Sequence, residues 1–471
     1  SGDARQQLHH PVAREVAVEH DADWEGTGCG YHNVFQDGDK YRMYYNGRHL
    51  EVLEGGRLSV GRHPYYLCYA ESDDGIHWTK PNLGLVEHKG SMENNIVMKV
   101  GLVGGVDADA AHVSVFLDEN PDAPADARYK AFIRSPKPLG MWPFKSPDGL
   151  HWTPMSEEPV LQGVGAFDSQ NLTFWDPTIK QYRAYWRIFS EGITTTEEWK
   201  PSGYRAIRTA TSDDMVNLGP HTDLTYEDSP DDELYTNQIK PYHRAPHILM
   251  GFPARYIERG WSQSMRDLPN LPGREMRASA VERYGTGLSE GLVMSSRDGV
   301  HFKRWNEAFM PPGPERPDAW QYGQQFIAWH AVETKSHMSG AANELSLYAA
   351  EGFWHGAGST LRRYTLRLDG FVSVSAPMEG GELVTKAMVF DGTSLHLNFA
   401  TSAAGSLQVA IEDADGTALP GFTLADCDVL FGNTVDRVVT WKGNADVSAL
   451  AGRAVRMRVV LQDADFYSFI F

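Results

Sequence analysis

The sequence predicts an all-β protein, a five-bladed β-propeller followed by a C-terminal β-sandwich. The first observation is a repeated phrase, Ser72–Trp78 (SDDGIHW), which returns at Ser146–Trp152 and Ser296–Phe302. Degenerate copies of this motif occur at Thr211–Met215 and Leu368–Phe371. Asp-Gly between polar and apolar residues is typical of a tight hairpin, because Gly tolerates positive φ and Asp caps its own turn. Five such hairpins at a long, loosely regular spacing indicate one repeated unit, as in a propeller.

The second observation is a set of short strands ahead of each hairpin. In the first unit, strands are expected over His32–Phe35, Tyr41–Tyr45 and Tyr65–Tyr69. Equivalent strands are expected over 112–116 and 128–132, 171–175 and 182–186, 238–242 and 247–251, and 325–329 and 344–348. Period-two alternation with aromatic and β-branched residues favours strands over helices. We therefore predict a propeller over residues 1–375, with very little helix.

The third observation is a change in composition after about Phe371. Trp and His become scarce, and Val, Leu, Ala and Asp-Gly turns take their place. Alternating runs at 394–399 and 455–461 are separated by turns at 413–416 and 442–444. Several short strands of this kind predict a β-sandwich over residues 376–471.

Composition and charge argue against several classes of binding partner and cofactor. The net charge of −19 over 471 residues argues against nucleic acid or an anionic membrane surface. No run approaches the ~18 apolar residues that a membrane span needs. Cys29, Cys68 and Cys427 are too few and too scattered for a disulfide framework or a zinc site. No P-loop or HExxH motif is present, so no cofactor is predicted, and calcium lacks a supporting EF-hand-like loop.

The candidate site comes from the propeller geometry. Segments leading into the innermost strand of each blade line one face of a propeller. Aligning the units places Gly30, Asp109, Asp168 and Tyr322 at equivalent positions ahead of these strands. Paired carboxylates can divide the work, one protonating a leaving group while the other stays ionised as nucleophile or base. The candidate catalytic acids are Asp168, Glu233, Glu25 and Asp109.

Asp168 is the favoured acid, because the stretch 166–171 holds no charged partner for it. Each of the other acids has an ordinary alternative, since loop carboxylates often cap turns or pair with Arg. Candidate substrate-binding residues are His32, Asn171, Arg187, Trp186, Tyr235 and Trp329. Core packing and internal hydrogen bonding are the competing interpretation of these residues. The stretch from Arg255 to Glu290 is expected to be a long loop, whose Arg residues could receive an anionic group or pair with the acidic body.

Together, the five units, the Ser-x-Asp-Gly-x-His-Trp hairpins, the acids leading into inner strands and the C-terminal sandwich resemble five-bladed propeller glycoside hydrolases. The resemblance is greatest to family 32, with family 43 as a neighbour. It implies a carbohydrate substrate and a secreted or periplasmic protein. Of the family 32 motifs, Arg-Asp-Pro is partly echoed by 167–169, so the resemblance carries a role only to Asp168.

The resulting hypothesis is a glycoside hydrolase acting on an oligo- or polysaccharide. Glu233 or Glu25 would protonate the glycosidic oxygen, and Asp168 would act as base or nucleophile. Two alternatives stay open. A propeller that binds glycan without cleaving it would hold one pocket carboxylate, or two separated by far more than ~10 Å. A phosphorolytic enzyme would need a basic phosphate site. The sugar, the linkage and the oligomeric state are left open.

Overall fold

The computed structural model describes residues 2–195 and 197–471, and it is all-β with a few short helices. The chain forms two compact units. The larger comprises Pro11–Thr334 and Leu345–Thr365, and the smaller comprises Ser1–His10, Lys335–Glu344 and Leu366–Phe471. Among the described residues, no helix is long and apolar enough to cross a membrane.

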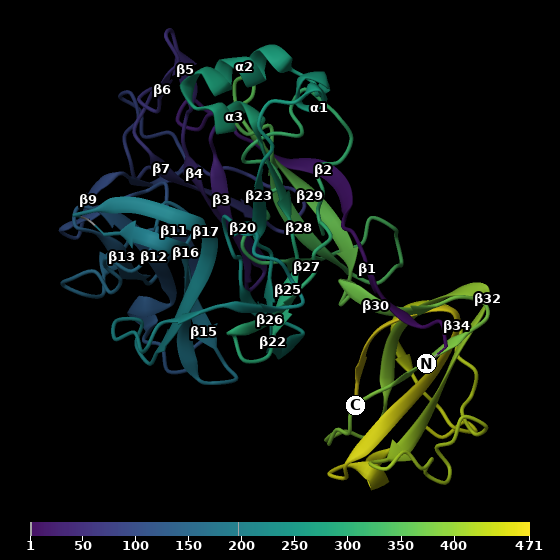
Figure 1. Cartoon of the computed structure of the whole chain (residues 1–471). Coiled ribbons are helices and arrows are strands. Elements are labelled where there is room, and N and C mark those ends of the chain that lie inside the picture. Colours follow the sequence, from purple (N-terminus) through teal and green to yellow (C-terminus); the bar gives the residue numbers. More distant parts are fainter. Residues whose placement is uncertain (1, 196) are drawn as a thin grey trace. The chain divides into compact units, whose positions relative to one another are not determined.

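The larger unit contains five sheets built on one antiparallel pattern of four strands (Figure 1). The first consists of β3 (Gly30–Asp37), β4 (Lys40–Gly47), β7 (Tyr66–Ser72) and β8 (Ile96–Lys99). The second consists of β11 (Val113–Leu117), β12 (Tyr129–Pro136), β13 (Leu139–Ser146) and β14 (Thr153–Pro154). The third consists of β15 (Leu172–Asp176), β16 (Gln181–Thr194), β17 (Trp199–Ser212) and β18 (Thr222–Asp223).

The fourth and fifth sheets each recruit a strand from elsewhere in the chain. The fourth consists of β21 (Lys240–Tyr242), β22 (Ala245–Gly251), β25 (Met294–Ser296) and β26 (His301–Arg304), and β19 (Thr225–Glu227) pairs in parallel with β26. The fifth consists of β27 (Val332–Thr334), β28 (Glu344–Glu351), β29 (Thr360–Arg367) and the N-terminal strand β2 (Val12–Glu19). The antiparallel pairing of β2 with β29 therefore ties the start of this unit to its end.

The predicted Asp-Gly hairpins share one hydrogen-bond pattern. At the first, Gly75 N donates to Ser72 Oγ (2.9 Å), and Ile76 N and His77 N both donate to Asp74 Oδ1 (2.8 Å each). The copies around Asp148 and Asp298 repeat these contacts, and the degenerate copy around Asp214 repeats the contacts to its Asp carboxylate. The pattern is local, which is why the sequence reveals it.

The faintest copy, Leu368–Phe371, is not a hairpin, and that prediction is wrong. The strands on either side of it do not pair with each other. β29 pairs with β2 and β28, whereas β30 (Val372–Ala376) pairs with β1 (Arg5–Leu8) and β34 (Val455–Ile470). The segment lacks the Ser two residues before Asp that caps the other turns, and it connects two different sheets.

Gly149 shows why the hairpins need glycine. Its φ is +82°, and a Cβ there would lie 2.4 Å from the hydroxyl oxygen of the fully buried Tyr44. Gly90 has a similar φ of +84° but open space around it. We expect Gly149→Ala to be less stable than Gly90→Ala by about 1–3 kcal/mol, because it adds a clash to the backbone strain. Urea denaturation of both variants measures the difference, and equal losses would contradict it.

The five first strands begin beside one another. Asn33 of β3 forms a parallel bridge with Trp329, just ahead of β27, and its Oδ1 accepts from Val115 N (3.1 Å). Gln170, just ahead of β15, donates to the same Oδ1 (3.0 Å). Gln238, just ahead of β21, donates to Gln170 Oε1 (2.8 Å) and to a carbonyl two residues before Trp329 (2.9 Å). Segments from all five sheets are thus joined at one place.

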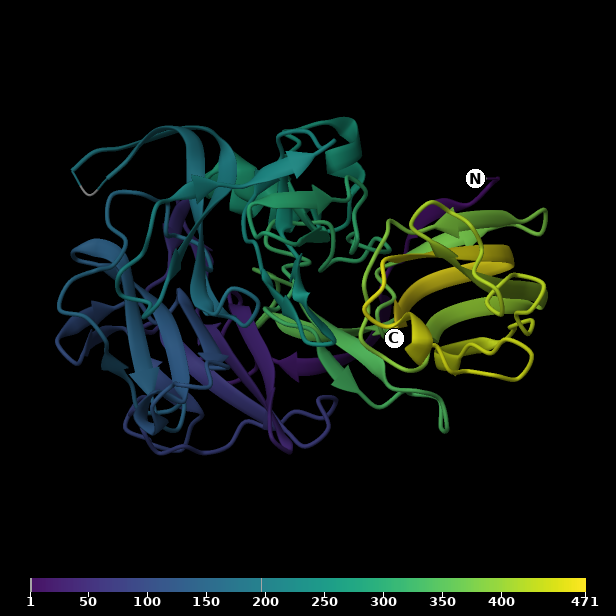
Figure 2. The same cartoon turned by 90° about the horizontal axis from the view of Figure 1, so that it is seen from below.

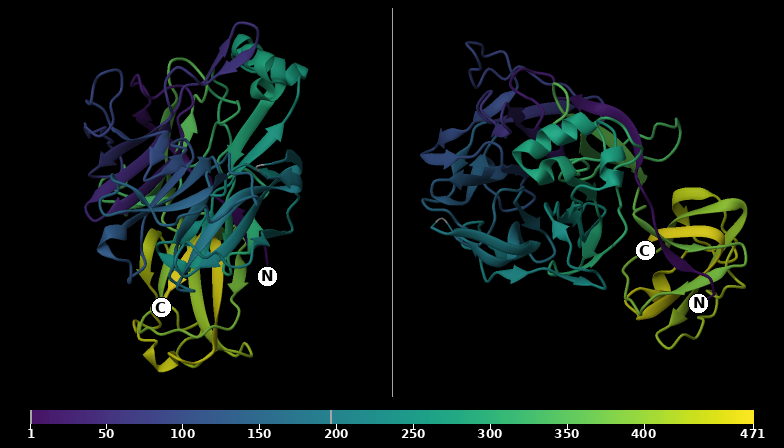
Figure 3. Two further views of the ribbon diagram at one scale, coloured as in Figure 1. Left: turned by 90° about the vertical axis from the view of Figure 1, so that its left-hand side faces the viewer. Right: turned by 45° about the horizontal axis from the view of Figure 1, so that its top comes forward.

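Two insertions stand at the same end of this unit (Figures 1 and 3). One is the hairpin of β5 (Glu51–Leu53) and β6 (Arg57–Ser59). The other contains α1 (Gln263–Asp267), α2 (Leu271–Ala280) and α3 (Glu282–Thr286), between β23 (Ala254–Glu258) and β24 (Gly287–Gly291). The hairpin tip packs on α2, since a Cβ on Gly56 would lie 2.4 Å from Ser279 O. The stretch expected as a long loop is therefore largely ordered as strand and helix.

Short elements complete the larger unit: β9 (Gly101–Val103) with β10 (Val106–Ala108), η1 (Ala125–Ala127) and β20 (Glu233–Leu234), which pairs with β23.

The smaller unit is built on two long strands, β34 and β32 (His396–Asp413), which pair along most of their length (Figure 2). β1, β30, β31 (Gly381–Val384) and β33 (Asn433–Val438) complete its six-stranded sheet, and η2 spans Ser448–Leu450. Alternate residues of the two long strands, Phe399 of β32 among them, are buried in one core that also contains Trp441. This alternation explains the sequence pattern that predicted strands here.

Candidate functional site

A pocket opens in the larger unit where the segments ahead of the first strands meet. It encloses about 820 Å³ of space, including its open mouth. Gly30 and Tyr31 from the first sheet, Asp168 ahead of the third, Tyr235 ahead of the fourth and Tyr322 ahead of the fifth all line it. Three of the four residues that the repeat alignment placed at equivalent positions, Gly30, Asp168 and Tyr322, therefore share one cavity, and the fourth, Asp109, does not line it.

The rest of the wall is aromatic and basic. Tyr284, Phe326, Phe353 and Trp354 contribute rings, and Arg48 and Arg283 contribute guanidinium groups. Leu50, Leu58 and Val60, in and around the β5–β6 hairpin, add an apolar edge. Aromatic faces suit the apolar faces of sugar rings, and a few polar groups among them provide orientation.

Asp168 is the acid that lines this pocket. Its side chain is 61% exposed, and its Oδ1 lies 2.8 Å from Nε2 of the buried His112. Desolvation in the pocket acts to raise the pKa of Asp168, but contact with His112 and the charges of Arg187 and Arg48 outweigh it and lower the pKa well below its usual range. The carboxylate is therefore ionised at neutral pH and open to a ligand.

Asp109 lies on the other side of the same imidazole. Its Oδ2 is 2.8 Å from His112 Nδ1, and Arg134 also contacts it. Burial acts to raise the pKa of Asp109, but His112 and Arg134 lower it. Asp109 is itself buried, so it holds His112 in place toward Asp168 and does not line the pocket. His112 thus links two of the four predicted acids.

The two carboxylates determine the charge of His112. Burial acts to lower the pKa of His112, but Asp109 and Asp168 raise it above 6.5. The pKa of His112 is higher in the folded than in the unfolded protein, so its protonation stabilises the fold. This stabilisation is complete below the unfolded pKa of about 6.5 and is lost as pH rises through the folded pKa. We expect the difference in unfolding free energy between wild type and His112→Gln to shrink between pH 6 and pH 9. Urea denaturation across that range measures it, and a difference that grows with pH would contradict it.

Arg187 and Asn171 support the segment that carries Asp168. Asn171 is buried, and its Nδ2 donates to Phe167 O and Ser169 O (3.0 Å each), the carbonyls on either side of Asp168. Arg187 is buried with its guanidinium carbon 4.8 Å from the centre of the Tyr235 ring. The two residues were predicted to bind substrate, and the structure places them directly behind the pocket wall.

Glu233 lies one layer away from the pocket. Its Oε2 accepts from Arg205 Nη1 (2.7 Å) and Arg205 N (2.9 Å). The Arg205 guanidinium carbon in turn lies 5.5 Å from the ring centre of the pocket residue Tyr235. Glu233 stands two residues before Tyr235 but is outside the set of lining residues.

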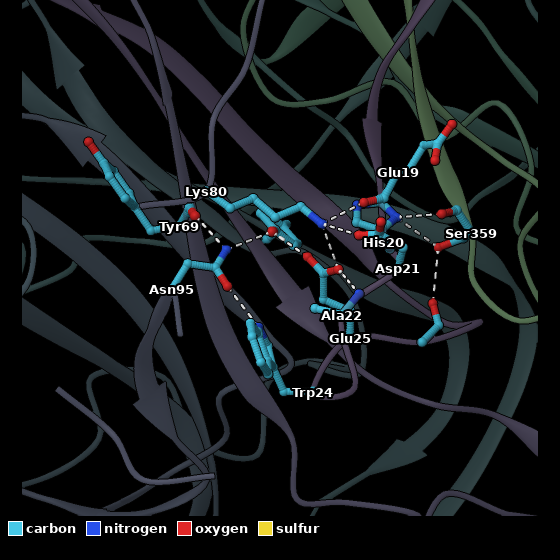
Figure 4. A network of polar contacts seen from close by, with 12 residues as sticks. Glu19, His20, Asp21, Ala22, Trp24, Glu25, Tyr69, Lys80, Asn95 and Ser359 are labelled. Carbon is cyan, nitrogen blue, oxygen red and sulfur yellow. Dashed lines mark hydrogen bonds and ion pairs between the residues drawn. The ribbon is translucent and has the colours of Figure 1, made fainter. Parts of the chain in front are cut away.

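Glu25 lies in a buried network away from the pocket (Figure 4). Its side chain has no exposed surface, and its Oε2 is 2.8 Å from Lys80 Nζ. Tyr45 donates to its Oε1 (2.6 Å), and Ala22 N donates to its Oε2 (2.9 Å). Asn95 donates to the Tyr45 hydroxyl (2.9 Å), so the carboxylate is a branching point in a structural network.

The remaining predicted binding residues are in the core. His32 is buried with its Nε2 3.1 Å from that of His20. Trp186 donates to Val164 O (3.0 Å), and Trp329 donates to Ile239 O (2.9 Å); both are fully buried. None of His32, Trp186 and Trp329 is among the pocket-lining residues.

Backbone strain marks the pocket as well. Tyr31 has φ +52° and Trp354 has φ +60°, a left-handed conformation that non-glycine residues seldom adopt. Such residues cluster at functional sites, where the surrounding structure holds them. Here both side chains line the cavity.

Sequence reasoning missed His112, Arg48 and Arg283. His112 was visible only as a strand start, although its spacing of three residues from Asp109 was a signal for their contact. Arg48 follows β4, and Arg283 lies in α3 within the stretch expected as a loop. No local pattern indicates that these two arginines reach the same pocket.

Comparisons with known proteins return distant structural neighbours. No family model matches the chain, and no curated protein has a significantly similar sequence. Similar solved structures include a thermostable family-43 glycoside hydrolase, 13% identical, with a TM-score of 0.43 over 74% of this chain and 93% of that chain. A fructofuranosidase from Schwanniomyces occidentalis, complexed with fructosylnystose, is 11% identical, with a TM-score of 0.37 over 97% of this chain and 98% of that chain.

An N-acetylgalactosamine deacetylase from F. plautii, in complex with blood group B trisaccharide, is also similar. It is 11% identical, with a TM-score of 0.41 over 77% of this chain and 94% of that chain. The neighbours thus include glycoside hydrolases, one of them from family 43. The similarities are loose, so the function proposed below rests on the site itself.

Proposed function

We propose that the protein is a glycoside hydrolase acting on an oligo- or polysaccharide in this pocket. One observation carries the proposal. The Asp168 carboxylate is open to an aromatic-lined cavity, while His112 holds it from behind and keeps it ionised. An ionised carboxylate that lines an aromatic pocket is one half of the machinery that cleaves glycosidic bonds.

We propose Asp168 as the base that activates water or the nucleophile that attacks the anomeric carbon. Glu233 is proposed as the proton donor to the glycosidic oxygen, because it stands two residues before the lining residue Tyr235. To donate a proton, its carboxyl group would have to leave the Arg205 guanidinium, which favours the ionised form. Asp109 is proposed as a positioning residue that acts through His112. Tyr235 and the other aromatic rings are proposed to stack on the sugar.

The architecture proposed with this function is the predicted one. The five sheets of the larger unit would be the blades of a propeller, with β2 completing the fifth. The smaller unit, with Leu366–Phe471 as its main segment, would be the β-sandwich. No cofactor is proposed, because Asp168 lies among the positive charges of Arg48, Arg187 and His112, which would repel a divalent cation. A secreted or periplasmic location is part of the proposal, and fractionation of the native cells tests it.

A second candidate function is glycan binding without cleavage. The observation that favours it is that Asp168 is the one carboxylate among the lining residues of the described pocket. The two candidates separate in a single experiment with the intact chain and a panel of neutral and acidic oligosaccharides. Release of new reducing ends supports the hydrolase, whereas saturable binding with no release for any bound glycan overturns it.

A further inference from the structure

Two guanidinium groups line the pocket without a direct ion pair to a carboxylate, although the charge of Arg48 helps to lower the pKa of Asp168. Arg48 donates from Nε to Gly28 O (3.3 Å), and Nη1 of Arg283 is buried with no hydrogen-bond partner among the described atoms. No described carboxylate lies within 4.0 Å of either side chain. Arg187, behind Tyr235, also lacks such a partner and donates from Nε to Ala166 O (3.0 Å). Three arginines thus surround a pocket with one acid.

Some other arginines of the larger unit do pair with acids. Arg255 contacts Asp232 and Glu290, and Arg304 contacts Asp232. The chain has 62 acidic and 43 basic residues, so acidic partners are plentiful. Arg48 and Arg283 therefore differ from Arg255 and Arg304 in having no carboxylate within ion-pair distance.

The buried arginines of α2 provide a second contrast. Arg274 donates to Ala319 O (3.2 Å) and Pro269 O (3.1 Å), and Arg277 donates to Tyr284 O (3.2 Å) and Trp354 O (3.4 Å). Their guanidinium groups fasten backbone segments beside the pocket. Arg48 and Arg283 instead line the pocket itself, and desolvating a guanidinium is costly unless an anion compensates it.

We infer that the pocket binds a sugar carrying an oxyanion, a carboxylate or a sulfate ester, between Arg48 and Arg283. The guanidinium fork matches the geometry of a carboxylate or a tetrahedral oxyanion and binds it through two parallel hydrogen bonds. Tyr284, whose ring centre lies 4.8 Å from the Arg283 guanidinium carbon, also lines the wall. Arg187 stays with Asp168, whose charge it stabilises. This inference rests on the proposed function only in treating the bound sugar as a substrate. The binding of an anionic sugar by the two arginines does not depend on hydrolysis.

The test measures binding to the intact chain by calorimetry, independent of turnover. The probes are D-glucuronate, D-glucose 6-sulfate, inorganic phosphate and neutral D-glucose. We expect one or more of the anions to bind at least about 10-fold more tightly than glucose, as charged hydrogen bonds predict. The tightest anion identifies the source: glucuronate indicates a uronic acid, glucose 6-sulfate a sulfated sugar, and phosphate alone a free co-substrate.

Variants assign the effect to the two arginines. Arg48→Met and Arg283→Met are each expected to weaken anion binding by about 10-fold or more. Arg48→Lys, which keeps the charge but loses the fork, should lie between Arg48→Met and wild type. Arg208→Met removes an exposed arginine paired with Asp223 on the outer strands and serves as the matched control, with anion binding unchanged.

The failures of the two proposals differ. Cleavage of neutral glycans with no preference for any anion overturns the inference and leaves the hydrolase in place. Anion binding that Arg48→Met and Arg283→Met both weaken, with no cleavage of any glycan, upholds the inference and removes the hydrolase. Anion binding that persists unchanged in both variants also overturns the inference, because the anion then lies elsewhere.

Discussion

Asp168→Asn is expected to lower kcat on a cleaved glycan by about 10²–10⁴-fold while leaving KM nearly unchanged. The change keeps the shape of the side chain and removes the negative charge that the reaction needs. Asn neither accepts a proton from water at neutral pH nor forms a covalent sugar intermediate. Sugar contacts with the aromatic wall are untouched, so binding should persist.

The fold should survive this substitution. The Asp168 side chain is 61% exposed, and although its carboxylate contacts His112, Asn171 also holds its segment through the two flanking carbonyls. Thermal unfolding checks this directly. A tightly binding but inactive Asp168→Asn protein would also be the form in which to capture a bound oligosaccharide.

Asp223→Asn is the matched control. Asp223 belongs to β18 of the third sheet, the sheet whose first strand Asp168 precedes; it is 52% exposed and pairs with Arg208 outside the pocket. We expect turnover to stay within about twofold of wild type, since surface pairs contribute little. Turnover by Asp168→Asn at the wild-type rate would remove Asp168 from the chemistry, and equal losses in both variants would point to a general defect.

Part of this site followed from the sequence because repeats encode position. Once the hairpins define the units, alignment places Gly30, Asp168 and Tyr322 at equivalent points, and the structure brings these residues to one pocket. The hairpins were predictable for a simpler reason: Ser, Asp and Gly satisfy one another within three residues of chain. Signals of this kind depend on short range or on repetition.

The rest depended on contacts that neither signal reveals. Arg283 reaches the pocket from an inserted helix that has no counterpart in the other units. Among the acids, alignment alone did not separate Asp168, which faces the cavity, from Asp109, which supports His112 from behind. Asp168 is a catalytic candidate and Asp109 a positioning residue because they lie on opposite sides of the His112 imidazole, and Asp168 lies on the side of the pocket.

The ion pair of Glu25 with Lys80 could not be read from the sequence, because the two residues are 55 positions apart. Lys80→Met is expected to destabilise the larger unit by about 3–5 kcal/mol, because it leaves a fully buried carboxylate without its cation. Glu25→Gln should cost less. Lys80 is 23% exposed and keeps Asp21 at 3.0 Å, so its charge stays partly solvated and paired.

The double variant Lys80→Met with Glu25→Gln should be more stable than the sum of the two losses, because it no longer buries an uncompensated charge. Urea denaturation of the four proteins gives the coupling energy. Turnover separates this structural role from the catalytic role predicted for Glu25. Folded Glu25→Gln should retain kcat within about tenfold, since its side chain lies outside the pocket. A stable Glu25→Gln protein with kcat lowered by about 10³-fold would instead make Glu25 the proton donor and displace Glu233 from that role.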